Sequence, residues 1–265
     1  MKRTRTLAGG VVLLLFLLMS SCAVEDLEDV VVVVDVKDEF YLDFWEKLSP
    51  EGRSFEFIIK TIEEENCTNA YIDHKYNKSG SNFAISIRNI FQPLNCAPGK
   101  APAQTNIDAG GLKLGVYTFS VDLKNTVFNN GQLTTLNDRY LISLETENGV
   151  RLARKELLRV PDEIIWGYAH YKSPDDEFGA LQFIEKIAQI GNYIPFKQGY
   201  YGYFNVGTGS VIDTVYDQPE DGHVIPFLLE FRGNSTELQE MINQFRADYG
   251  AEVTFQLHNS LGQSF

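Results

Sequence analysis

One stretch decides the fold that we expect for this chain, Ile164-Ile165-Trp166-Gly167-Tyr168-Ala169-His170-Tyr171. It predicts a strand with apolar residues on both faces. Ser173-Pro174-Asp175-Asp176 follows and is typical of a helix start, since Ser caps the helix, Pro suits its first position and acids favour its dipole. Gly191-Asn192 predicts the end of that helix. This part of the chain therefore begins as a strand followed by a helix.

The residues up to the C-terminus repeat this order. The region 200–216 is hairpin-like around Gly207-Thr208-Gly209, and 224–231 predicts a further strand. Asn234-Ser235-Thr236-Glu237 predicts a second capped helix, and a last strand spans 253–257. Two successive β-α-β units resemble the ferredoxin-like, split βαβ arrangement. Either 200–206 or 211–216 would be its second strand, and the other would be an addition at the edge.

The sequence predicts only β-strands and turns for residues 54–160. Apolar residues alternate with polar ones along 55–62, and glycine-rich turns such as Gly110-Gly111 and Asn148-Gly149 separate the predicted strands. This spacing predicts an antiparallel β-sandwich. Leu112, Gly115 and Tyr117 form a Leu-x-x-Gly-x-Tyr motif, which resembles a strand of immunoglobulin-like domains.

The expected fold class is therefore α+β, an N-terminal antiparallel β-sandwich followed by a ferredoxin-like domain. The expected boundaries are a leader at 1–21, an acidic tether with the first strand or strands at 22–53, the sandwich at 54–160 and the ferredoxin-like domain at 161–265.

The first residues have the parts of a secretory signal. Lys2, Arg3 and Arg5 precede an apolar run of 13 residues, which is too short for a membrane-spanning helix of about 20 residues. Leu17-Leu18-Met19-Ser20-Ser21-Cys22 resembles the lipobox of bacterial lipoproteins. That resemblance implies cleavage before Cys22 and attachment of a fatty acid such as palmitate to it. The alternative is cleavage by an ordinary signal peptidase.

The other two cysteines, Cys67 and Cys96, predict a disulfide because the chain is exported. The alternative is a metal-binding thiol pair, but no His or further Cys stands near them at ligand spacing.

The net charge is strongly negative. It is −13 for the chain and −16 once the three basic residues of the leader are lost. Such a chain repels phosphate backbones, so we expect no nucleic-acid partner. An anionic lipid surface would also repel it, so membrane attachment would depend on the lipid. The acids after Cys22 resemble the sorting tether of lipoproteins that reach the outer membrane or the cell surface, and we expect that location, facing the periplasm or the exterior.

No catalytic constellation is visible. The four histidines show no metal-binding spacing, and neither a Gly-x-Ser-x-Gly elbow nor a phosphate-binding loop occurs. We expect structural roles for His170 and His258 in their strands. The loop with Asp217, Glu220, Asp221 and His223 offers oxygen ligands for a divalent cation, but a solvated loop is the preferred interpretation. The sequence therefore predicts no catalytic residue, no metal and no cofactor.

The candidate binding surface is aromatic. It consists of Tyr193, Phe196, Tyr200, Tyr201 and Tyr203. Exposed tyrosines provide rigid contact area, and aromatic rings stack on sugars. The alternative is that these residues are the core and rim of a strand. We therefore expect a non-enzymatic, lipid-anchored envelope protein that binds a protein or a glycan. The alternative is an envelope hydrolase that uses acidic residues of the C-terminal domain.

Overall fold

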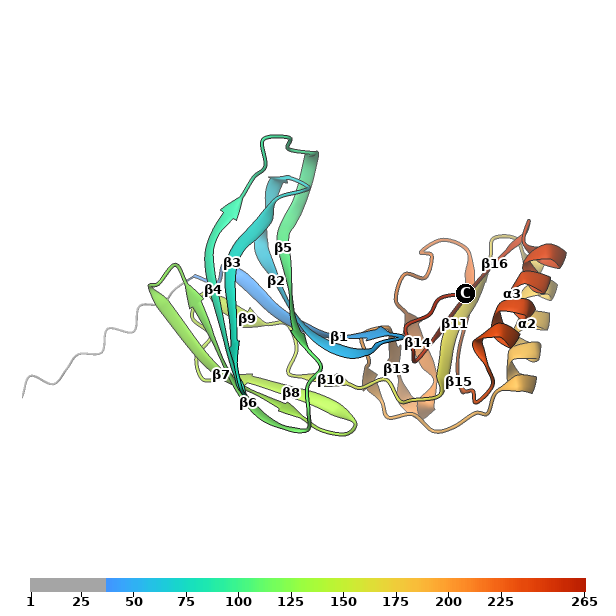
Figure 1. Cartoon of the computed structure of the whole chain (residues 1–265). Coiled ribbons are helices and arrows are strands. Elements are labelled where there is room, and N and C mark those ends of the chain that lie inside the picture. Colours follow the sequence, from blue (N-terminus) through green and yellow to red (C-terminus); the bar gives the residue numbers. More distant parts are fainter. Residues whose placement is uncertain (1–36) are drawn as a thin grey trace, which may run out of the picture. The chain divides into compact units, whose positions relative to one another are not determined.

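A computed structural model describes residues 37–265, which belong to one compact unit. The predicted leader, Cys22 and the first part of the predicted tether segment, residues 22–36, lie outside the described residues. The described part of the chain is mainly β, with one ten-stranded sheet, two three-stranded sheets and two α-helices (Figure 1).

The ten-stranded sheet contains every strand between residues 37 and 158. Its strands are β1 (Phe40–Ser49), β2 (Gly52–Cys67), β3 (Tyr71–Ser79), β4 (Asn82–Phe91), β5 (Pro98–Gly110), β6 (Gly115–Leu123), β7 (Val127–Thr135), β8 (Arg139–Leu144), β9 (Val150–Leu152) and β10 (Glu156–Leu158). Their order is β10-β8-β7-β6-β4-β3-β5-β2-β1-β9. Three of the pairings, β1 with β9, β3 with β5 and β4 with β6, are parallel.

The predicted immunoglobulin-like, antiparallel sandwich is therefore wrong. The strands form one mixed sheet, which begins at Phe40 and curls on itself (Figure 1). Strands β9 and β10 lie at opposite ends of the sheet, yet only residues 153–155 connect them. The connection forces the two ends together: the Ala153 amide donates to the Leu42 carbonyl at 2.9 Å, and the Ile142 amide donates to the Lys155 carbonyl at 3.0 Å. The alternation of apolar residues defines a buried face but does not say whether one sheet or two enclose it.

Aromatic side chains fill the inside of the curled sheet. The Phe55 ring lies 5.1 Å from Phe57 and 5.0 Å from Tyr140, and Phe57 lies 5.8 Å from both Phe83 and Phe119, measured between ring centroids. Burial of each such phenylalanine contributes about 1.5–3 kcal/mol. Outward-facing residues of β1, β2 and β5 are consequently free to form a surface.

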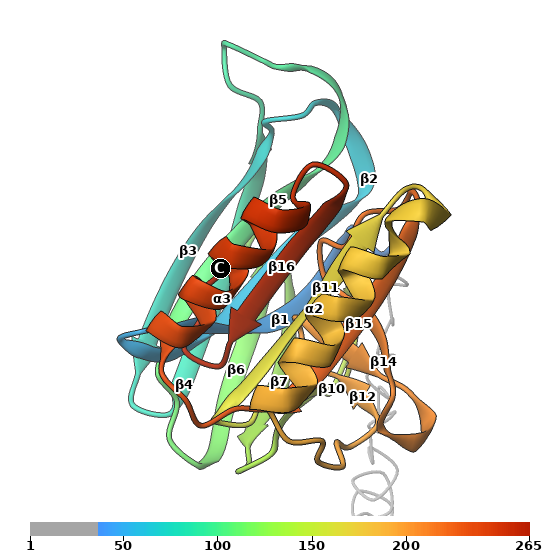
Figure 2. The same cartoon turned by 90° about the vertical axis from the view of Figure 1, so that its right-hand side faces the viewer.

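The C-terminal part contains an antiparallel sheet in the order β15 (His223–Glu230), β11 (Ile164–Tyr171), β16 (Val253–Asn259). Both α2 (Glu177–Ile190) and α3 (Ser235–Tyr249) cover one face of it (Figure 2). The predicted helix starts are confirmed. Ser173 caps a 3₁₀ turn, η1 (Pro174–Asp176), which leads into α2, and the Asn234 side chain accepts a hydrogen bond from the Glu237 amide at the start of α3.

The ferredoxin-like prediction is also wrong, because the second strand of that arrangement is missing from the sheet. Residues 199–215 instead form a small sheet of their own, β12 (Gly199–Tyr200), β13 (Phe204–Val206) and β14 (Ile212–Val215), with a 3₁₀ turn η2 (Thr208–Ser210) between the last two. Every residue of β11 is buried, so the sheet needs cover on both faces. The helices cover Ile165 and Ala169, while Trp166 packs against Phe204 of the small sheet at 5.3 Å.

A shared core joins the two parts. Leu48, Leu158 and Val160 come from the N-terminal part, which forms the large sheet, and Trp166 and Phe204 come from the C-terminal part. Within residues 37–265, no helix is long and apolar enough to cross a membrane.

Candidate functional site

The structure separates the five aromatic residues of the predicted binding surface. Tyr193 is exposed, Phe196 and Tyr201 are buried, and Tyr200 and Tyr203 are half-buried. Phe196 and Tyr201 line a cavity together with Arg159, whereas Tyr200 lines a different groove. These residues therefore do not form one continuous surface.

The groove, which we call the aromatic groove, has a volume of about 310 Å³. It is lined by Asp43, Trp45, Glu56, Ile58, Lys60, Gln104, Asn106, Arg154, Tyr200 and Tyr216. The register of the sheet builds its floor: Asp43 pairs with Ile58 and Ile58 with Asn106, so these residues lie in one row across β1, β2 and β5. Since adjacent strands are about 4.8 Å apart, the row presents side chains at regular spacing.

Aromatic rings form one wall of the groove. The Trp45 ring lies 4.7 Å from Tyr203 and 5.5 Å from Tyr216, and both contacts are edge-on. The Tyr203 hydroxyl accepts hydrogen bonds from Trp45 Nε1 at 3.2 Å and from the Leu48 amide at 3.0 Å, which holds the indole in place. Tyr216 is 62% exposed and presents its ring to solvent.

Charged and amide groups of the floor and of Arg154 line the rest of the groove. The Arg154 guanidinium stacks 3.7 Å from the centre of the Tyr200 ring and donates through Nη2 to Asp43 Oδ2 at 2.8 Å. Gln104 Nε2 donates to Asn106 Oδ1 at 2.7 Å. Burial raises the pKa of the Tyr200 hydroxyl, and the Asp43 charge adds to this although Arg154 opposes it. The Tyr200 hydroxyl therefore stays protonated at neutral pH and remains a hydrogen-bond donor.

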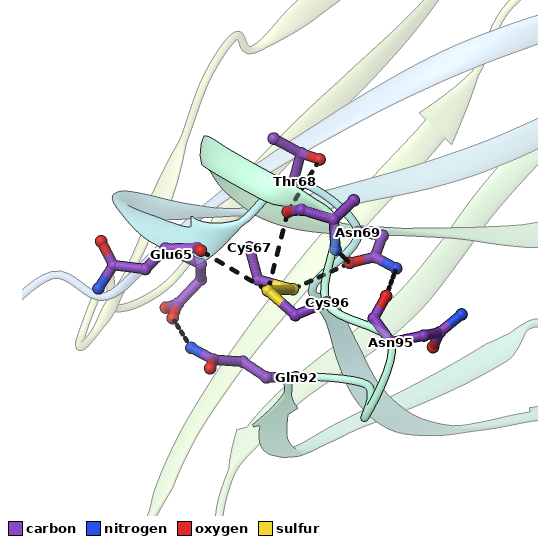
Figure 3. Close-up of a disulfide and its surroundings, with 9 residues drawn as sticks. Glu65, Cys67, Thr68, Asn69, Gln92, Asn95 and Cys96 are labelled. Carbon is purple, nitrogen blue, oxygen red and sulfur yellow. Dashed lines mark hydrogen bonds between the residues drawn. A yellow bond between two sulfur atoms is a disulfide. The ribbon is translucent and has the colours of Figure 1, made fainter.

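The predicted disulfide between Cys67 and Cys96 is confirmed, with 5.4 Å between their Cα atoms (Figure 3). Cys67 ends β2, and Cys96 lies in the loop between β4 and β5. Asn69 supports the same loop, because its Oδ1 accepts from the Ala97 amide at 2.9 Å and its Nδ2 donates to the Asn95 carbonyl at 3.2 Å.

The histidines and acids of the C-terminal part make local contacts. His170 is buried in β11 with Nε2 2.8 Å from the Asp221 carbonyl, and His258 in β16 stacks on Trp166 at 5.7 Å. Asp221 Oδ2 pairs with Lys172 Nζ at 2.8 Å. In the part of the chain that the structure describes, no three His, Cys, Asp or Glu side chains are grouped as metal ligands.

Most groove residues were not predicted from the sequence. Asp43 and Trp45 fell in the segment interpreted as tether and first strand, and Tyr216 fell in the uncertain edge strand. A signal exists for the first two, because Phe40, Leu42 and Phe44 alternate with Tyr41, Asp43 and Trp45. This alternation predicts that Asp43 and Trp45 face away from the core.

Comparison of the chain with protein-family models, with curated proteins and with solved structures finds no significant match.

Proposed function

We propose that this protein is a lipid-anchored protein of the cell envelope that binds a glycan in the aromatic groove. The observation that carries the proposal is the placement of Trp45, Tyr200 and Tyr216 around a floor of carboxylate and amide groups. Aromatic faces pack on the C–H faces of sugar rings, while carboxylates, amides and guanidinium groups hydrogen-bond to adjacent hydroxyls. Sugars need this combination because each ring has both apolar and polar faces.

The dimensions of the groove favour a glycan over a protein partner. A concave site of about 310 Å³ matches a small ligand. A stable protein interface instead needs about 800 Å² on each partner. The hydrolase alternative is not proposed, since the carboxylates of the groove, Asp43 and Glu56, come from β1 and β2 and not from residues 161–265.

The anchor rests on the resemblance of the leader to a lipobox ending at Cys22. One acyl chain holds a protein to a membrane only marginally, whereas several chains hold it stably. Metabolic labelling with an alkyne fatty acid tests the anchor: we expect label on the wild type and none on Cys22→Ala. Label that survives Cys22→Ala, or a wild type without label, contradicts the anchor and leaves the glycan proposal to its own test.

Glycan binding is tested with a glycan array, followed by calorimetric titration of the best ligand. We expect Tyr216→Ala to weaken binding about tenfold, because loss of one stacked ring removes roughly 1–1.5 kcal/mol. Tyr71→Ala is the matched control, since Tyr71 is an exposed tyrosine of β3 outside the groove.

Thermal unfolding checks that both tyrosine variants remain folded, which we expect because both side chains are exposed. A wild type that binds no glycan, or a Tyr216→Ala variant that binds as tightly as the wild type, overturns the proposal.

A further inference from the structure

A second cavity lies at the shared core between the large sheet and the C-terminal part, and we call it the junction pocket. Its volume is about 490 Å³. Its charged lining residues are Arg53, Asp138, Arg159, Asp162 and Lys197. None of these residues lines the aromatic groove, so the two sites are separate.

A buried carboxylate lies behind the junction pocket. The Glu46 side chain is 0% exposed, and both of its oxygens are saturated. Oε2 accepts from Arg53 Nη1 at 2.9 Å and from the Val160 amide at 3.3 Å, and Oε1 accepts from Arg159 Nε at 3.0 Å and from the Tyr140 hydroxyl at 2.8 Å. Burial raises the pKa of Tyr140, so its hydroxyl stays a neutral donor. One carboxylate is therefore shared by two guanidinium groups at the back of the pocket, and Asp162 supplies the second negative charge.

The two arginines differ in the number of carboxylates that they contact: Arg53 contacts two and Arg159 one. Asp162 Oδ1 accepts from Arg53 Nη2 at 2.6 Å, although the Asp162 side chain is 89% exposed and screened by water. Arg159 has no second carboxylate: its Nη1 donates to the Leu136 carbonyl at 3.3 Å, and within residues 37–265 its Nη2 donates no hydrogen bond. Arg159 therefore keeps one donor nitrogen, Nη2, that is not used within residues 37–265.

Lys197 is the second available cation. Arg139 forms salt bridges with the two neighbouring carboxylates, at 2.6 Å to Asp138 and at 2.8 Å to Glu156. The ammonium group of Lys197 lies 3.9 Å from the same Asp138 and 3.4 Å from the same Glu156. It is thus held only weakly, and it lines the pocket together with Arg159.

The remaining wall of the junction pocket is apolar. Leu158, Val160, Phe196 and Tyr201 are all buried in the shared core and line the cavity. A pocket of this size, with an apolar wall and a few polar groups at one side, is typical of a small-molecule site.

We propose that the junction pocket binds a small organic anion with one carboxylate and an apolar body. The carboxylate forms ion pairs with Arg159 and Lys197. The guanidinium group of Arg159 matches a carboxylate in geometry and charge. The apolar body packs on Phe196 and Tyr201. The site is independent of the glycan proposal because it uses no residue of the aromatic groove.

The test uses benzoate as the probe, titrated into the purified full chain and followed by ligand-observed NMR and calorimetry. Benzamide is its neutral isostere, and inorganic phosphate is an anion without an apolar body. We expect benzoate to bind, and benzamide and phosphate to bind at least about tenfold more weakly. Lys197→Gln should weaken benzoate about fivefold, and Lys197→Arg should restore it.

The matched control is Lys172→Gln, an exposed lysine outside the junction pocket, which should leave benzoate binding unchanged. Both lysines lie at the surface, so both variants are expected to fold. Absence of benzoate binding, equal binding of benzamide or phosphate, or an effect of Lys172→Gln equal to that of Lys197→Gln overturns the proposal.

Discussion

At the residue scale, packing changes the acid–base behaviour of His258. Its ring stacks on Trp166, and its Nδ1 lies 2.9 Å from Ser264 Oγ. Burial lowers the pKa of His258, although the charge of Asp217 opposes this. The folded protein therefore binds a proton at His258 less readily than the unfolded chain, in which the histidine has the ordinary pKa of about 6.5.

The lowered pKa of His258 predicts a pH-dependent stability. Because the unfolded state binds the additional proton, the free energy of unfolding should fall as the pH drops below about 6.5. Urea unfolding at about pH 7.5 and about pH 5.5 measures this fall. We expect His258→Gln to reduce the fall and His223→Gln, at an exposed position that begins β15, to preserve it. The same fall in the wild type and in His258→Gln would exclude His258 as its source.

At the element scale, β11 depends on a glycine for its close approach to both neighbours. A Cβ atom at Gly167 would collide with the backbone carbonyl of Gln256 in β16 and would lie 2.9 Å from the Phe227 ring of β15. Gly167 therefore allows the central strand of this sheet to pack, although glycine itself has low strand propensity.

We predict that Gly167→Ala lowers the free energy of unfolding by about 1–3 kcal/mol, the usual cost of overpacking. Urea denaturation measures the change. Thr254→Ala in β16 is the control, because Thr254 is exposed and its truncation should change stability by about 0.5 kcal/mol or less. A Gly167→Ala protein as stable as the wild type would mean that β16 can shift to accommodate the methyl group.

At the scale of the whole molecule, the shared core couples the large sheet to the C-terminal part. Leu48 and Leu158 pack in the same cluster as Trp166 and Phe204, and Tyr203 accepts a hydrogen bond from the Leu48 amide. Neither part can lose this cluster without exposing the apolar surface of the other. The coupling also places the junction pocket between elements that are far apart in the sequence.

We therefore predict one cooperative unfolding transition for the described part of the chain. Far-UV circular dichroism reports on all strands, and tryptophan fluorescence reports on Trp45 and Trp166, which contact Tyr203 from the two sides of the junction. The midpoints of the two signals in urea should coincide. Two separated transitions would show that the parts fold independently.

Local features of the fold could be predicted from the sequence. The caps at Ser173 and Asn234, the buried strand at 164–171 and the Cys67–Cys96 pair depend on neighbouring residues or on simple counting, and the structure contains all four. The sandwich and ferredoxin-like predictions were wrong, because both required the choice of which strands pair.

The sequence by itself determined which residues face a core, through alternation with the period of a strand, and where the helices begin. Only the tertiary structure decided which segments meet. It buried Glu46 between Arg53 and Arg159, and it brought Trp45 beside Tyr216. The physical reason is that Arg159 and Tyr216 are separated by long stretches of chain from Glu46 and Trp45, and contacts of that kind depend on strand order and packing, which no local pattern encodes.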